Sequence, residues 1–286
     1  MRARRAPPVA PSAHETLRAE LGAIIALAGR APSPLNLRPW LFRARAGGVD
    51  LLLDRQRLLP ASESALRQAL LACGAALFTM ELAARHVGVS PRVTLWPEPV
   101  SSPDFLARLE PAALAAPSAT DELLAAAALG RVTRRGPFER SFVPSGVADL
   151  LAATATSQGA VLVSVPPGVR RDNLDAVLLA AEAAGADDPA REAGLRDLWD
   201  RPPDTATVEI LCTEQDEPSD WLAAGQALQQ LLLIGTVNWV QARFFTMGLE
   251  DPTLRDEVRH AVCGDRYPQV VLELGQAAAS SAEGAA

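Results

Sequence analysis

The chain has 286 residues, of which 49% are hydrophobic, and a formal net charge of −7 at pH 7. This length and apolar content can fill one large core or two closely joined cores. The acidic balance argues against a nucleic-acid partner, because binding to phosphates along a backbone requires a basic face.

Side chains that commonly carry catalysis or bind metals are few. All 27 basic residues are Arg, so a lysine Schiff base is excluded, and a bound phosphate must be met by guanidinium groups or backbone amides. The odd number of cysteines and the lack of a CxxC pair argue against a disulfide framework and a structural zinc site. No histidine lies at ligand spacing from another His or Cys, so we expect no metal. These residues are Cys73, Cys212, Cys263, His14, His86 and His260.

The first half of the chain alternates helical and strand patterns. Apolar residues recur at helical spacing from His14, and Gly29 and Pro32 end that helix. A later segment is apolar nearly all round, which predicts a helix buried on every side. In chain order we expect a helix at 14–29, a loop at 32–40, strands at 42–46 and 49–54 joined at Gly47-Gly48, a helix at 63–87, a strand at 92–96 and a proline-rich linker at 97–103.

The second half begins near Thr120 and shows a similar alternation. Thr120 or Asp121, Ser145 and Asp220 are expected to cap helices, and Pro252 suits the first turn of a short helix after Asp251. In chain order we expect helices ending at Gly130 and Ser157, a strand at 160–165, helices at 172–184 and 189–199, a strand at 207–212, a helix at 220–243, a short helix at Pro252 and a strand at 269–274.

Two terminal segments and one long apolar segment bear on localisation. We expect residues 1–13 to be a disordered arm rather than a signal peptide, and residues 276–286 to be a disordered tail. Residues 221–242 carry no charge and are long enough to cross a bilayer. Their five amide side chains would be expensive in hydrocarbon, however, so we predict a buried helix in a soluble, cytoplasmic protein with no membrane partner.

The two halves resemble each other in outline. Each places one long, nearly uncharged helix between strands, so we interpret residues 14–119 and 120–275 as two fused half-repeats with the long helices packed at the centre. Any mixed protein can contain two buried helices, and this alternative stays open on the helices alone. The order of elements predicts an α+β fold, a sandwich of sheets and helices.

Arg131, Thr133 and Arg135 form the first candidate binding motif. In an extended segment alternate residues point the same way, so two guanidinium groups and a hydroxyl would face one spot. This set suits a phosphate dianion, with about 1.5–3 kcal/mol per hydrogen bond to a charged group. Arg-rich turns are also common on surfaces, and the motif alone does not decide between the two interpretations.

Pro32, Ser33 and Asn36 form the second candidate. Pro fixes the backbone, while Ser and Asn offer short donors and acceptors to a ligand with carbonyls and ring nitrogens. Pro39 is expected to hold Arg38 in an extended conformation. By itself this segment is also compatible with an ordinary loop.

Together the two segments resemble the nitroreductase superfamily of flavoproteins. The family pattern Pro-Ser-x-x-Asn-x-Gln-Pro-Trp is matched within residues 32–40, and the pattern Arg-x-Ser/Thr-x-Arg within residues 131–135. The similarity extends over about residues 14–275. It is closest to the actinobacterial, dormancy-associated Acg-type proteins, on the residues Val49–Asp54, Arg57, Cys73–Leu77, Pro137-Phe138, Asp220–Leu228 and Tyr267–Gln269.

The resemblance implies one composite FMN site. In typical family members one subunit of a dimer supplies the Arg motif and the other supplies the Pro-Ser-Asn loop. This chain has the loop only in its first half and the Arg motif only in its second, which implies a pseudo-dimer, monomeric or paired further as a homodimer. By carry-over, Arg131 and Thr133 hold phosphate, Arg135 lies near the ribityl chain and pyrimidine edge, and Pro32, Ser33 and Asn36 reach over from the other half. Gly248, Glu250 and Asp251 fall where relatives offer backbone to flavin N5.

The implied activity is that of an FMN-dependent oxidoreductase. NAD(P)H would pass hydride to flavin N5, and a small acceptor such as a quinone or nitro compound would take the electrons. Arg135 would stabilise the reduced, anionic flavin, and no catalytic side chain is required. The alternatives are an FMN storage protein with little turnover and a flavin-free scaffold that acts through partners.

Four departures from the family pattern bear on these alternatives. Arg38 stands where relatives have Gln, and its cation is expected to sit on the flavin or to face solvent. Glu273 replaces an Arg that is common in Acg-type relatives. The Arg-containing tail is missing, which predicts weaker FMN binding. The segment between Trp199 and Thr207 is short, which predicts a shortened lid over the flavin.

Overall fold

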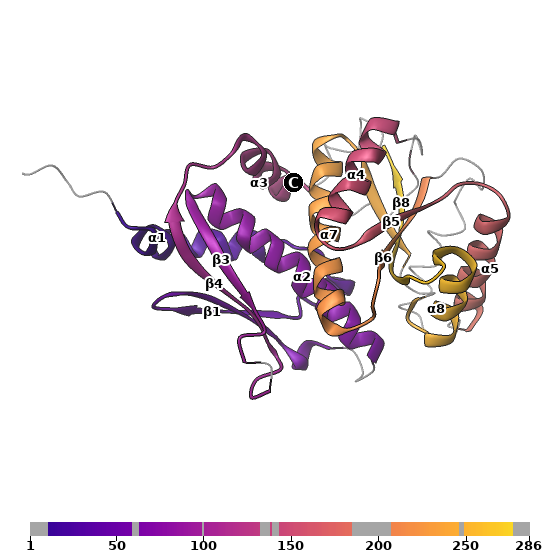
Figure 1. Ribbon diagram of the computed structural model, residues 1–286, viewed down its shortest axis with the longest axis horizontal. Coiled ribbons are helices and arrows are strands. Elements are labelled where there is room, and N and C mark those ends of the chain that lie inside the picture. Colours follow the sequence, from indigo (N-terminus) through magenta and orange to yellow (C-terminus); the bar gives the residue numbers. More distant parts are fainter. Residues whose placement is uncertain are drawn as a thin grey trace, which may run out of the picture.

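A computed structural model describes residues 11–58, 63–98, 100–131, 138, 143–184, 207–245 and 249–276. Two antiparallel sheets lie on either side of two long helices, α2 (Glu63–His86) and α7 (Pro218–Val237), with the first half on the left of Figure 1 and the second on the right. The predicted α+β fold, with long buried helices at its centre, is confirmed. The predicted helix at 189–199, the arm at 1–10 and the tail from 277 lie outside the described residues.

The first half forms a four-stranded sheet in the order β1-β2-β4-β3. Along β2, Val49, Leu51 and Leu53 enter the core with α2, while Asp50 lies on the opposite face, as the two-residue period of a strand requires. The elements of this half are α1 (Ala13–Ala28), the 3-10 turn Pro34–Asn36, β1 (Trp40–Arg45), β2 (Gly48–Leu53), the 3-10 turn Arg55–Arg57, α2, β3 (Val89–Leu95) and β4 (Phe105–Leu114).

The second half repeats this plan: a helix, two strands, a long helix and two strands, with the sheet order β5-β6-β8-β7. In both sheets the register shifts between the two central strands. The predicted duplication is confirmed, while its boundary at residues 119 and 120 stays a prediction. The elements are α4 (Ser145–Ser157), β5 (Val161–Val165), β6 (Thr207–Thr213), α7, β7 (Gln241–Phe245) and β8 (Tyr267–Gly275), with α3 (Ala119–Gly130) as the connection between halves and α5 (Val169–Ala184), α8 (Pro252–Val258) and the π-helical turn Arg259–Cys263 as additions.

Helices α2 and α7 cross at a pair of glycines. A Cβ atom on Gly74 would collide with the carbonyl oxygen of Leu222, and a Cβ atom on Gly225 would collide with that of Leu71. Only glycine permits this approach of two backbones. Further along the crossing, buried Gln229 donates from Nε2 to Thr79 Oγ1 at 2.9 Å. The two halves therefore share one closely packed centre.

Helix α2 is, among the described residues, the one helix that is long and apolar enough to cross a membrane. Of its most apolar window, 78% is buried inside the fold, as expected for the core helix of a folded domain. The uncharged segment at 221–242, whose length also suggested a membrane span, is divided between α7 and the start of β7.

Two strands were missed by the sequence analysis. Strand β4 occupies residues expected to follow a linker, and Pro111 within it hid the strand pattern. Pro111 pairs with Pro91 of β3 where the register shifts, so that neither ring interrupts a regular ladder. The predicted helix at 220–243 was too long, because Asn238 caps α7 and Trp239 takes a left-handed φ of 60° before β7 begins.

Several caps and one turn also differ from the predictions. Ser118, rather than Thr120 or Asp121, caps α3, and Asp121 completes its capping box. Glu217 precedes α7, and the carboxylate of Asp220 accepts a hydrogen bond from its backbone N–H at 3.0 Å. Ser145 is the first residue of α4 rather than its cap. The hairpin turn lies at Ala46-Gly47, because Arg45 pairs with Gly48. At α3 and α7 the shift follows from side-chain capping that the apolar pattern does not encode.

Candidate functional site

The loop at residues 29–39 connects α1 to β1 and has a strained backbone. Three of its residues have left-handed φ values: Leu35 at 47°, Asn36 at 58° and Arg38 at 52°. Each such conformation in a residue other than glycine costs on the order of 1 kcal/mol and persists only where the surroundings impose it. The prediction of an extended Arg38 was therefore wrong.

Hydrogen bonds within and around the loop impose this shape. The backbone N–H of Arg38 donates to Ser33 Oγ at 3.0 Å, and its side-chain Nε donates to Asn36 Oδ1 at 3.2 Å. Pro39 is anchored through its carbonyl, which accepts from the backbone N–H of Asp54 at 3.1 Å and from Cys73 Sγ at 3.3 Å. The loop is thereby fixed against β2 and α2.

Two polar groups of this loop are free to meet a ligand. Among the described residues, the structure records Ser33 Oγ only as an acceptor, and it records no acceptor for the Asn36 side-chain nitrogen. Asn36 is exposed and Ser33 is half-buried. Pro32 is half-buried beside them, and the guanidinium of Arg38 is exposed toward solvent and bound to Asn36.

Arg131 lies beside the start of this loop. Its backbone N–H closes α3 by donating to Ala127 at 2.8 Å, and its Nη2 donates to the carbonyl of Arg30 at 3.4 Å. Arg30 in turn donates from Nε to the Ala128 carbonyl at 3.3 Å and from Nη2 to the Leu129 carbonyl at 2.5 Å. The segments that carry the two motifs are therefore tied together. Thr133 and Arg135 lie outside the described residues.

The cation of Arg30 is close enough to Arg131 to shift its pKa. Burial, and then the neighbouring cation of Arg30, lower the pKa of Arg131. Both effects disfavour the charged form of Arg131, so an anion beside the two cations would offset their repulsion. The pair suits a dianion such as a phosphate.

The connection after β7 reaches α2 at another point. Gly248 lies outside the described residues. Gln68 donates from Nε2 to Glu250 Oε1 at 3.0 Å. The carboxylate of Asp251 caps α8, because its Oδ1 accepts from the backbone N–H groups of Thr253 and Leu254 at 2.8 and 3.1 Å. The carboxylate of Asp251 therefore has a structural role at the start of α8.

A buried polar network supports this connection and was not predicted. Arg255 makes two 2.6 Å bonds to the carboxylate of Asp216, which also accepts from the indole of Trp221 at 2.7 Å. Gln269 donates from Nε2 to Thr213 Oγ1 at 2.8 Å. Burial opposes ionisation of Asp216, but the donors outweigh it and lower its pKa to about 2. In the sequence, the one feature that could have indicated this network is Arg67, a cation within the apolar helix α2 whose side chain reaches Gln269.

Glu273, which replaces an Arg common in relatives, has a structural partner. It lies opposite Arg243 in the pairing of β7 with β8, and Arg243 Nη2 donates to its Oε2 at 2.6 Å. Both side chains are at most 5% exposed. The departure at position 273 therefore belongs to a buried ion pair inside the second sheet.

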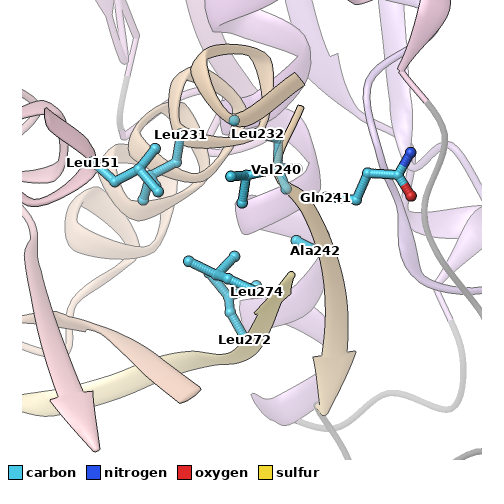
Figure 2. Close-up of a pocket in the computed structure, with 9 residues that line it drawn as sticks. Leu151, Leu231, Leu232, Val240, Gln241, Ala242, Leu272 and Leu274 are labelled. Carbon is cyan, nitrogen blue, oxygen red and sulfur yellow. The ribbon is translucent and has the colours of Figure 1, made fainter. Parts of the chain in front are cut away.

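A small hollow in the second half contains none of the predicted site residues. Figure 2 shows leucine side chains gathered in it, while the amide of Gln241 points away from them. The hollow is a gap in the apolar core rather than a cofactor site. Its lining residues are Leu151, Leu231, Leu232, Gly235, Val240, Gln241, Ala242, Leu272 and Leu274.

Comparison with known sequences confirms the resemblance that the two motifs indicated. A putative NAD(P)H nitroreductase of Mycobacterium tuberculosis is 28% identical over 297 residues, which cover 89% of this chain and 84% of the relative. The putative NAD(P)H nitroreductase acg of the same species is 27% identical over 292 residues, with 88% of each chain covered. An uncharacterized protein of this species is 26% identical over 300 residues, which cover 88% of this chain and 85% of the relative. The chain is a relative of these nitroreductase-like proteins.

No protein-family model matches the chain. Among solved structures, a nitroreductase with bound FMN from Bacteroides fragilis is similar at a TM-score of 0.42 and 15% identity, covering 57% of this chain and 90% of that one. A nitroreductase with bound FMN from Desulfitobacterium hafniense is similar at a TM-score of 0.45 and 14% identity, covering 54% of this chain and 89% of that one.

Proposed function

We propose that the protein binds one FMN between its two halves and works as an NAD(P)H-dependent oxidoreductase on a small acceptor, a quinone or a nitro compound. The observation that carries this proposal is the contact between Arg131 and Arg30. It brings the candidate phosphate motif of the second half against the first-half loop that holds Ser33 and Asn36. The names of the sequence relatives, putative NAD(P)H nitroreductases, support the choice of reaction.

The described residues fit FMN in charge and in hydrogen bonding. The guanidinium group of Arg131, which donates to the main chain of Arg30, suits the phosphate, and the donor groups of Ser33 and Asn36 suit the carbonyls and ring nitrogens of an isoalloxazine. The strained backbone of the loop is typical of a site shaped in advance for a ligand. Thr133 and Arg135 are assigned to the same site by their place in the motif, and the backbone near Glu250 and Asp251 to its redox-active edge.

When bound, FMN supplies hydride acceptance from a nicotinamide and electron transfer to the acceptor. The protein's part is to bind and orient it. Arg131 would neutralise the phosphate, with a hydrogen bond from Thr133, and Arg135 would stabilise negative charge at the pyrimidine edge. Pro32, Ser33 and Asn36 fix the ring from the other half. Arg38 places an exposed cation at the rim, where it can attract an anionic reductant.

The test begins with the purified full chain. We expect it to be yellow or to take up added FMN in a one-to-one ratio. Under anaerobic conditions NADPH or NADH should bleach the bound flavin within seconds, and a quinone or nitro compound should restore the colour. Retained colour with no bleaching would contradict the enzyme and support FMN storage. A colourless protein that takes up no FMN would contradict both and support a flavin-free scaffold.

A further inference from the structure

Arg67 is a buried cation of the first half that holds main chain of the second half. It is 2% exposed, close to the start of α2. Its Nη2 donates to the carbonyl of Leu249 at 2.6 Å, and its Nη1 donates to the carbonyl of Gln269 at 3.0 Å. One side chain therefore fixes the connection after β7 and the strand β8 to the same helix of the other half.

This arrangement is expensive if its only purpose is packing. Burial, and then the nearby Arg255, lower the pKa of Arg67 to about 9, so the group stays charged at neutral pH. A Met or Leu side chain would fill similar space without the cost of burying a charge. What the guanidinium adds is two directed bonds that end on main-chain oxygens, which an apolar side chain cannot make.

Gln68, the residue after Arg67, holds Glu250, the residue after Leu249. Gln68 donates to the side chain of Glu250 at 3.0 Å, directly beyond the Leu249 carbonyl that Arg67 holds. Consecutive residues of α2 thus hold consecutive residues of the connection. On its other side, the connection continues through Asp251 into α8, where Arg255 joins it to Asp216.

We propose that Arg67 is a positioning residue that, with Gln68, sets the main chain at Leu249–Asp251 against the redox-active edge of the cofactor. The inference rests on the proposed function, because that function assigns this connection to the flavin. In this arrangement the first half contributes its own loop to the site and also fixes the part that the second half contributes.

The test uses two substitutions of Arg67 and one matched control in the full chain. Arg67→Met removes both bonds and the charge, whereas Arg67→Lys keeps the charge but replaces the fork by a single ammonium group. Arg171→Met is the control: Arg171 is also 2% exposed and also donates from Nη2 to a main-chain carbonyl, that of Val165, at 2.6 Å. It lies on α5 at the far right of Figure 1, where α5 packs against α8 and shares an apolar cluster with Leu249. The control therefore removes a buried arginine close to the connection but keeps the bonds to Leu249 and Gln269.

The first readout is amide hydrogen exchange of FMN-free protein. We expect both Arg67 variants to exchange at least tenfold faster than wild type at residues 249–258, and Arg171→Met to match wild type there. The second readout is FMN affinity, which both Arg67 variants should lower about tenfold. Gln68→Ala serves if either Arg67 variant fails to fold, and should raise exchange at Glu250 and Asp251 by a smaller factor.

The outcomes separate this inference from the proposed function. If the wild type binds FMN but Arg67→Lys matches it in both readouts, charge alone suffices and the positioning role is wrong. If exchange at residues 249–258 rises equally in Arg171→Met, the effect is a general loss of stability and the inference is also wrong. If the wild type binds no FMN, the proposed function fails, while local exchange still decides whether Arg67 holds the connection.

Discussion

The connections α1–β1 and α4–β5 occupy equivalent places in the two halves and differ in what they hold. The first spans residues 29–39, contains three left-handed residues other than glycine and touches Arg131 through Arg30. The second spans only residues 158–160, where Gly159 makes the turn with a φ of 76°. The short turn leaves no counterpart of the Ser33–Asn36 loop in the second half, which agrees with the proposal of one FMN site rather than two.

The largest effect is expected from the arginine motif at residues 131–135, which the proposed function places opposite the long connection. Arg131→Ala combined with Arg135→Ala should weaken FMN binding at least a hundredfold, because it removes the cation assigned to the phosphate and the cation assigned to the pyrimidine edge, and each lost bond to a charged group is worth about 1.5–3 kcal/mol. Fluorescence titration with FMN measures the loss. Arg18→Ala with Arg43→Ala, two exposed arginines outside the proposed site, is the control and should bind FMN as wild type does. Unchanged binding in the first variant would show that the phosphate lies elsewhere.

A second comparison concerns the ion pairs of the two sheets. Glu273→Gln should lower the free energy of unfolding by about 3 kcal/mol, because it removes the negative charge that faces Arg243 in a buried ion pair. Asp50→Asn in the first sheet should cost less, about 1–2 kcal/mol, because Asp50 is buried but its partners Arg45 and Arg108 are 51% and 34% exposed and stay solvated when the carboxylate is lost. Urea unfolding measures both. Equal losses would mean that burial does not distinguish the two sheets.

The helix crossing should respond equally from either half. Gly74→Ala and Gly225→Ala should each destabilise the fold by about 3 kcal/mol, because the new methyl group meets a backbone carbonyl that cannot move aside cheaply. Gly22→Ala on α1, which meets nothing within 4 Å, is the control and should stabilise by about 0.5–1 kcal/mol. If only one of the two alanine substitutions destabilised the fold, the expectation that both helices are equally close at the crossing would be wrong.

A pH effect is expected from the second half. Burial raises the pKa of Glu209 from its usual 4.5 to about 7, outweighing a hydrogen bond with Ser164 and the charge of Arg171. A raised pKa in the folded state gives a stability contribution that is complete below about pH 4.5 and is lost as pH rises through 7. The contribution is on the order of 2–3 kcal/mol. Glu209→Gln should flatten this slope in thermal unfolding curves, and an unchanged slope would contradict the assignment.

The smallest effects are expected from substitutions in the two connections, α4–β5 and α1–β1. Gly159→Ala should cost about 1 kcal/mol, because alanine resists the left-handed conformation of the short turn. Leu35→Gly in the long loop should be nearly neutral, since relief of strain is offset by the greater freedom of glycine in the unfolded chain. A loss of more than about 1 kcal/mol at Leu35 would show that its exposed side chain contributes to packing.

Local patterns predicted most of the elements, and the errors have local causes. Strand β4 was hidden by Pro111, and β7 by an uncharged run that continues α7 in composition but not in conformation. The two motifs could be found because their residues are close in sequence. The contact between Arg30 and Arg131, and the network that Arg67 joins across about 200 residues, could not be predicted, because pairings at such distances leave no periodic signal.

Helix α3 has a further consequence as the covalent link between the halves. In a dimer of separate subunits, a shared site is lost on dilution as the subunits part, whereas here the partner segment stays at a high effective concentration at any dilution. The two halves are also inherited as one unit, so each can change without copying the change into the other.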